Sequence, residues 1–137
     1  MSPYRMTAVT VVALSLALAA AGCSSPTSGL GDLDRDPTTT DHPLPPDITD
    51  EALADVDRDS LRWVGEHGGA DLWLAVGEPG YDACLVIYPD GTDWLVTCGG
   101  ALMESSTSTG LKFAVVPDGG TVPAGFEAVS RNVFAAS

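Results

Sequence analysis

Two histidines, His42 and His67, are the only residues of this 137-residue chain that could act as a histidine base. His42 lies in an acidic, proline-rich stretch, and His67 precedes two glycines in a predicted hairpin turn. The chain has no G-x-S-x-G nucleophile motif, and the serines of residues 104–110 are typical of a mobile loop. Nothing places a carboxylate pair such as Glu66 and Asp71 in a cleft. We therefore expect a non-enzymatic protein without a cofactor.

One acidic motif has the spacing of a calcium-binding loop. Four carboxylates stand at the first, third, fifth and twelfth positions of an EF-hand loop, namely Asp55, Asp57, Asp59 and Glu66. Ser60 replaces the glycine that such a loop needs, and two nearby arginines bring positive charge toward the ion. The same alternation recurs at residues 32–36 without a continuation, which indicates a compositional origin. The sequence favours the absence of a metal site and leaves calcium binding as an alternative.

The first of the three cysteines, Cys23, follows the pattern of an export signal. Arg5 precedes an uncharged run, residues 7–21, that is dominated by Ala, Val and Leu and is typical of a signal peptide. The small residues directly before Cys23 resemble the lipobox of bacterial lipoproteins, with Ala20 where that family usually has Leu. The resemblance implies cleavage after Gly22 and acylation of Cys23, which suffices for stable membrane attachment. An uncleaved membrane helix and a plain secretory signal are the alternatives.

The other two cysteines, Cys84 and Cys98, flank a predicted hairpin. If its turn is centred on Gly91, residues whose numbers sum to 182 face each other, so that Cys84 faces Cys98. Directly opposed residues lie roughly 4.5 to 5.5 Å apart at Cα, a separation that a disulfide bridges. An exported protein has the oxidising surroundings in which the bond persists. We predict a Cys84–Cys98 disulfide, with two free thiols or a metal pair as the alternative.

The segments around these residues divide the chain into three parts. Residues 1–22 are the predicted signal peptide, residues 23–59 carry the lipidated cysteine and an acidic tether, and residues 60–137 form a small domain. The tether is rich in Pro, Thr, Ser and Asp and poor in large apolar residues, so we expect it to be disordered and extended. Within it, residues 48–56 could form a short helix capped by Thr49, but only if the helix docks on the domain.

Apolar residues recur with period two through the domain, which predicts β-strands. The expected strands are residues 61–66, 71–76, 84–88, 94–98 and 111–116 and a last extended segment at 126–134. This pattern predicts an all-β fold, a small antiparallel sandwich or partly open barrel of about six strands. In the register given by the Gly91 turn, both faces of the cysteine hairpin are apolar, so we expect that hairpin to be central.

The domain is unusually rich in large aromatic rings. Five of them are singled out: Trp63, Trp73, Trp94, Tyr81 and Tyr88. We expect all five to pack in the core of so small a domain. The alternative is that some lie at the surface and serve a partner.

The charge balance and several short strings indicate where the protein works. Six Lys and Arg against nineteen Asp and Glu give a net charge of −13, which argues against a nucleic-acid or anionic-lipid partner, since both need a basic surface. The lipobox, the acidic tether and the strings at residues 61–67, 97–100 and 130–134 resemble small uncharacterised lipoproteins of actinobacteria. The resemblance implies a shared fold and location but no catalytic or binding residue. We expect a lipid-anchored cell-envelope protein on the outer face of the cytoplasmic membrane that binds an envelope partner. The alternative is an extracytoplasmic cation or small-ligand binding protein.

Overall fold

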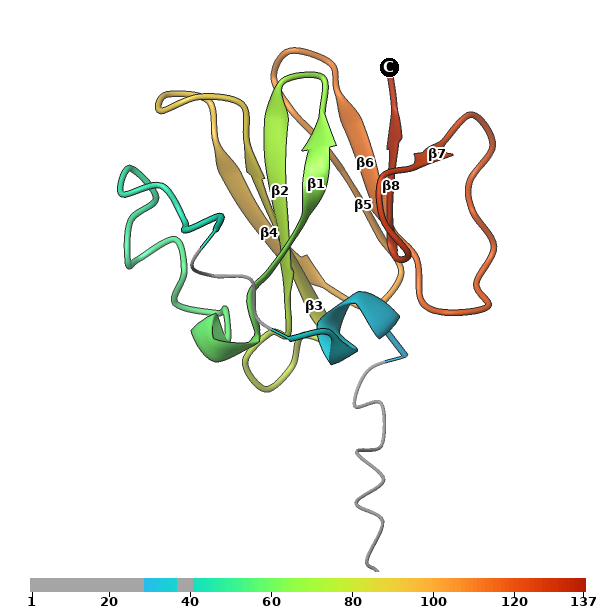
Figure 1. Cartoon of the computed structure of the whole chain (residues 1–137), viewed down its shortest axis with the longest axis horizontal. Helices are drawn as coiled ribbons and strands as arrows, with labels where there is room; N and C mark the ends of the chain where they lie inside the picture. The colour runs from blue at the N-terminus through green and yellow to red at the C-terminus, as the bar shows by residue number, and fades with distance from the viewer. Residues whose placement is uncertain (1–28, 37–40) are drawn as a thin grey trace, which may run out of the picture.

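Short strands separated by glycine- and proline-led turns form two antiparallel sheets in the computed structural model, which describes residues 29–36 and 41–137 (Figure 1). Sheet 1 has the order β1-β2-β3-β4 and sheet 2 the order β5-β6-β8-β7. The sheets pack face to face, which confirms the predicted all-β sandwich, with eight strands rather than about six. In the described ranges no helix is long and apolar enough to cross a bilayer. The predicted signal peptide and Cys23 lie outside these ranges.

The strands are short, as a domain of this size requires. Those of sheet 1 are β1 (Arg62–His67), β2 (Ala70–Ala75), β3 (Ala83–Tyr88) and β4 (Leu95–Gly99). Those of sheet 2 are β5 (Met103–Ser106), β6 (Lys112–Val115), β7 (Glu127–Ala128) and β8 (Val133–Ala136). Gly68 and Gly69 make the β1–β2 turn with φ values of +59° and +81°. Two successive positive φ values are the requirement of a two-residue type I′ hairpin, and only glycine adopts them without strain.

The cysteine hairpin has the predicted register. Cys84 faces Cys98, Leu85 faces Thr97 and Val86 faces Val96. The two cysteines form a disulfide, with their Cα atoms 4.0 Å apart. β3 lies inside sheet 1 as expected, whereas β4 is an edge strand because no further strand pairs with it in the described residues.

Sheet 1 is apolar on both faces and contributes to two cores. Its inner face packs against sheet 2 through Leu72, Leu85, Phe113 and Val133, all fully or almost fully buried. Its outer face carries Trp73, Ala75, Cys84 and Val86. Residues of the segment 41–57 cover that outer face and bury Ile48, Leu53 and Val56. Both faces of β3 are thereby removed from water.

The tether prediction is wrong for its described parts, because both pack on the sandwich instead of extending from it. Leu30 is fully buried in the core between the sheets and leads into the short 3-10 helix η1 (Gly31–Asp34). Residues 41–57 lie against the outer face of sheet 1 and lead into η2 (Arg58–Ser60). Residues 48–56 dock as expected but form a series of turns, and the hydroxyl of Thr49 accepts a hydrogen bond from the amide of Ala52.

Two other segments differ from the prediction. Residues 104–106, expected in a mobile loop, belong to strand β5, which pairs with β6 from Met103↔Val115 to Ser106↔Lys112. The segment 126–134, expected as one extended piece, is divided into β7 and the start of β8 by a turn in which the amides of Val129 and Ser130 donate to the carbonyl of Val133. The remaining predicted strands are confirmed to within about a residue or two at each end.

Candidate functional site

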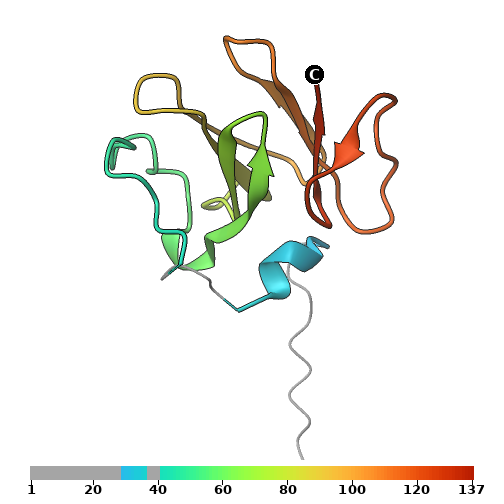
Figure 2. The ribbon, with the colours of Figure 1, turned by 45° about the horizontal axis from the view of Figure 1, so that its top comes forward.

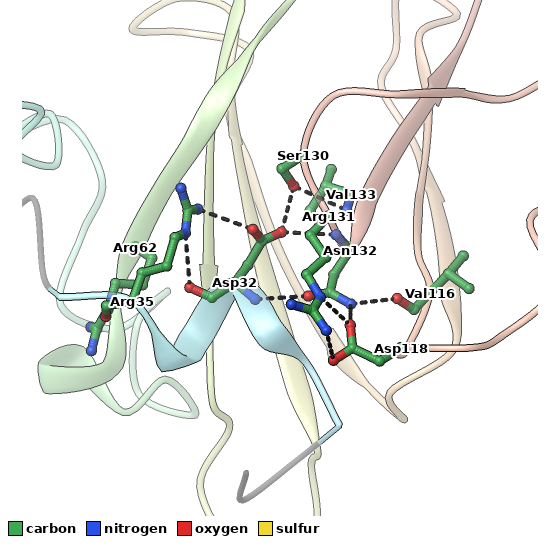
Figure 3. A network of polar contacts seen from close by, with 9 residues as sticks. All are labelled: Asp32, Arg35, Arg62, Val116, Asp118, Ser130, Arg131, Asn132 and Val133. Carbon is green, nitrogen blue, oxygen red and sulfur yellow. Dashed lines mark hydrogen bonds and ion pairs between the residues drawn. The ribbon is translucent and has the colours of Figure 1, made fainter.

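A buried carboxylate fastens η1 to the turn between β7 and β8. Asp32 is 3% exposed, and its Oδ2 accepts hydrogen bonds from the hydroxyl of Ser130 at 2.6 Å and from the amide of Asn132 at 2.8 Å (Figure 3). Its Oδ1 pairs with Arg35 at 3.1 Å. A buried carboxylate is stable only when its oxygens are hydrogen-bonded or paired. The three partners of Asp32 meet that requirement.

Asn132 completes the connection from the other side. Its side chain is fully buried, and its Oδ1 accepts from the amide of Asp32 at 2.9 Å. Its Nδ2 donates to the carbonyl of Val116 at 2.9 Å and to Asp118 Oδ1 at 3.0 Å. Two residues that stand 100 positions apart in the chain therefore satisfy each other's buried polar groups.

An ion pair covers this connection on the solvent side. Arg131 donates to both carboxylate oxygens of Asp118, at 2.8 and 2.9 Å. Hydrogen bonds to Asp118, first from Arg131 and then from Asn132, hold the pKa of its carboxyl below the ordinary value of 3.8. The guanidinium lies so close over Gly31 that a Cβ there would overlap Arg131 Nε. Glycine is therefore required at position 31 if the ion pair is to keep this place.

We call the set of residues that holds the first described segment the η1 latch; its members are Leu30, Asp32, Asp118, Ser130, Arg131 and Asn132. The carbonyl of Gly29 adds a hydrogen bond from the amide of Asp118 at 2.7 Å. In the described part of the chain, no buried side-chain nitrogen or oxygen lacks a hydrogen-bond partner. The hydrogen bonds of the latch therefore attach the first described segment to the sandwich. No sequence signal identified it.

The two histidines have packing contacts in separate places. The ring of His42 stacks on that of Trp63, with centroids 3.7 Å apart and planes 6° apart, and its carbonyl accepts from Trp73 Nε1 at 3.0 Å. The ring of His67 lies edge-on to Phe113, with centroids 6.1 Å apart. His42 therefore joins the segment 41–57 to the outer face of sheet 1, whereas His67 adjoins the core between the sheets.

The four acidic residues with calcium-loop spacing have other roles or positions. Asp57 caps η2 by accepting a hydrogen bond from the amide of Asp59 at 3.1 Å, and Glu66 lies in β1 opposite Asp71. Ser60, which replaces the loop glycine, donates to the carbonyl of Asp57 and accepts from the amide of Val76. No group of three or more His, Cys, Asp or Glu side chains within residues 29–36 and 41–137 is placed to hold a metal ion.

The large aromatic residues do not all lie in the core. Trp73 is 4% exposed, as expected, but Trp63, Trp94 and Tyr88 are half-buried and Tyr81 is exposed. The hydroxyl of Tyr88 donates to Asp47 at 2.6 Å, and this bond raises the pKa of Tyr88 above its ordinary value of 10.0. The expectation that all five rings are buried is correct for Trp73 and wrong for Tyr81.

Two adjoining hollows lie along β5, each of about 360 Å³. They share Glu104. The first is lined by Glu104, Ser105, Ser106, Lys112 and Phe126, and the second by Leu102, Met103, Glu104, Thr121 and Pro123. Leu102 is 62% exposed, and Val122, which stands between two lining residues of the second hollow, is 37% exposed. We call these hollows and their borders the β5 surface.

The β5 surface and the η1 latch differ in what they can do. The latch residues bond to one another, whereas the β5 surface presents apolar side chains beside a carboxylate and an ammonium group. Such a mixture is typical of a contact surface. Sequence reasoning missed this surface because it assigned the serine-rich part of β5 to a loop. Comparison of the chain with models of protein families, with curated proteins and with solved structures finds no match.

Proposed function

We propose that the protein is a lipid-anchored envelope protein whose sandwich binds another envelope protein on the outer face of the cytoplasmic membrane. The residues before Cys23, which resemble a lipobox, support the anchor. The Cys84–Cys98 disulfide supports export, because such bonds persist in oxidising compartments and are rare in the cytosol. In this proposal the domain acts by contact and carries no catalytic residue.

The observation that carries the contact proposal is the composition of the β5 surface. Three large hydrophobic side chains are exposed in the described residues; one of them, Leu102, lines the second hollow, and another, Val122, stands in the chain between two of its lining residues, Thr121 and Pro123. Single exposed apolar residues are normal in any protein, but grouped ones beside a concave surface favour a binding role. Glu104 and Lys112 supply a polar border that can orient a partner.

The anchor is tested by replacing Cys23 with alanine. The wild-type chain should be recovered in the membrane fraction at the mass of a cleaved, acylated protein. The Cys23→Ala variant should leave the membrane fraction because it lacks the thiol that carries the proposed lipid. A variant that stays wholly in the membrane at its unprocessed mass would favour the transmembrane alternative.

The contact surface is tested by crosslinking in living cells, followed by identification of the captured proteins. The double variant Leu102→Ser, Val122→Ser should lose a partner that the wild type captures. Tyr81→Ser is the matched control, because Tyr81 is the third exposed large hydrophobic residue and does not line the hollows. If the control loses the partner and the double variant keeps it, the contact surface does not lie at the β5 surface. Ester or cell-wall hydrolysis that depends on His67 would overturn the non-catalytic proposal.

A further inference from the structure

The η1 latch determines which part of the sandwich meets the membrane, and we infer that the end carrying η1 lies against the lipid surface. The occupant of this end is the headgroup region of the bilayer in which Cys23 is anchored. The inference rests on the proposed lipidation of Cys23. It replaces the picture of a domain held away from the membrane by a long tether.

The first step of the argument is the length of chain between the anchor and the sandwich. Leu30 is fully buried, so the chain is fixed to the domain at that residue. Six residues, 24–29, separate it from Cys23. In any conformation, each of the seven residue-to-residue steps from Cys23 to Leu30 spans at most about 3.6 Å, so the Cα atoms of these two residues lie no more than about 25 Å apart.

The second step is the strength of the attachment at Leu30. The attachment combines the buried Leu30 side chain with the two hydrogen bonds that the Asp32 carboxylate accepts from Ser130 and Asn132. It continues in the bond from Asn132 to Val116. Detaching this segment from the sandwich would expose Leu30 to water and leave the Ser130 hydroxyl and the Asn132 amide without their acceptor. The effective tether therefore ends at residue 30 and not at residue 59.

The third step is the position of η1 on the sandwich. Figures 1 and 2 both show η1 (blue) at one end, next to the strands of both sheets and opposite the end from which the C-terminus projects. Arg62, at the start of β1, donates a hydrogen bond to the carbonyl of Arg35, so β1 begins at the η1 end. Because β2 is antiparallel to β1 and ends where β1 begins, the β2–β3 turn lies at the same end. A strand of six residues is about 20 Å long. The opposite end of the sandwich therefore lies about 20 Å farther from the lipid than the η1 end does.

The orientation of the sandwich also sets the direction of the β5 surface relative to the lipid. β5 begins near the η1 end, after its short connection from β4, and runs toward the opposite end beside β6. The β5 surface therefore runs up the side of the domain, away from the lipid. A tether that ended at residue 59 would instead give a flexible chain of 36 residues with a root-mean-square length of about 30 to 36 Å and no fixed orientation.

Energy transfer from the domain to labelled lipids tests the orientation. Exposed Glu78, in the β2–β3 turn, and exposed Ser137, at the opposite end, are each replaced with cysteine and labelled with a donor dye without reducing agent. The lipidated full-length chain is reconstituted in phosphatidylcholine vesicles that contain an acceptor-labelled headgroup. Glu78→Cys should show several-fold stronger transfer than Ser137→Cys. Equal transfer, or stronger transfer from Ser137→Cys, would overturn the inference.

A pair of insertions identifies the latch as the cause. Twelve Gly and Ser residues inserted between Ser28 and Gly29 lengthen the chain before the latch, so the difference between the two probes should shrink. The same insert between Thr38 and Thr39 lies after η1 and leaves the distance from Cys23 to Leu30 unchanged. It should preserve the difference. If both inserts abolish the difference equally, the latch does not set the orientation.

Flotation of the same vesicles separates this inference from the proposed anchor. Protein that floats with the vesicles and carries the mass of the acylated form, but shows equal transfer at both probes, would refute the orientation alone. Protein that neither floats nor carries lipid mass would refute the anchor, and the orientation with it. Unlipidated Cys23→Ala chains carrying the same dyes provide the baseline for transfer by chance encounter.

Discussion

Replacing Asp32 with alanine should reduce the free energy of unfolding by about 2 to 4 kcal/mol. The change removes the acceptor of the Asn132 amide, which belongs to a fully buried residue, and of the Ser130 hydroxyl. A buried donor left without an acceptor costs about 1 to 3 kcal/mol, and the half-buried Ser130 hydroxyl adds to this. The Arg35 ion pair contributes little, because that side chain is 54% exposed and its charge is screened by solvent.

Urea unfolding of chains that begin at Ser24, followed by tryptophan fluorescence, measures this loss. Asp34→Ala is the matched control, because it makes the same change of charge at an exposed position of the same short helix. The control should stay within about 0.5 kcal/mol of the wild type. Asp32→Asn keeps one acceptor oxygen and should fall between the two. Hydrogen exchange should show faster exchange of the Asn132 amide in Asp32→Ala.

The reasoning fails if Asp32→Ala and Asp34→Ala unfold at the same urea concentration. It also fails if Asp32→Ala is destabilised while the Asn132 amide keeps its full protection from exchange. In that case the loss of stability would not come from the bond between Asp32 and the Asn132 amide.

Three further predictions concern the sandwich itself. Removing the disulfide by Cys84→Ala with Cys98→Ala should cost about 3 kcal/mol by the chain-entropy model for a loop of about 15 residues, measured by urea unfolding; an unchanged midpoint would contradict it. Trp73→Ala should cost about 3 to 5 kcal/mol because the ring is buried, whereas Trp63→Ala should cost less. In an absorbance titration, Tyr88→Phe should remove a phenol that ionises above pH 10.0. Because folding raises this pKa, the bond to Asp47 stabilises the fold below pH 10.0 and the contribution is lost as the pH rises through the folded-state pKa.

The register of the cysteine hairpin could be predicted to the residue because the information that sets it is local. The turn around Gly91 fixes the register, alternation of apolar residues fixes the faces, and the Cys84–Cys98 pair follows from both. The β1–β2 hairpin is similar, because two glycines mark its turn. In these segments, turn chemistry and period-two pattern agree, which is the condition under which sequence patterns are reliable.

β5 and the latch could not be predicted because the deciding contacts are distant in sequence. There is no apolar alternation in Glu104, Ser105 and Ser106. These residues form a strand only because their backbone pairs with that of β6. Leu30 and Leu33 are the two large apolar residues in a stretch of glycine, aspartate, serine and arginine, a composition typical of disorder. Leu30 is buried in the core between the sheets, and its neighbour Asp32 is held by Asn132, a partner that nothing near Leu30 signals.

The separation of 100 residues between Asp32 and Asn132 has a consequence for the order of assembly. In a chain that emerges from its amino to its carboxyl end, sheet 1 and the β5–β6 hairpin can form from neighbouring segments as they appear. The η1 segment must wait, because the groups that donate to its Asp32 carboxylate belong to the turn before β8. Closure of so long a loop is entropically costly and comes late in folding. A chain cut before Ser130 would thus retain most of its strands, but its η1 segment would lack the groups that hold Asp32.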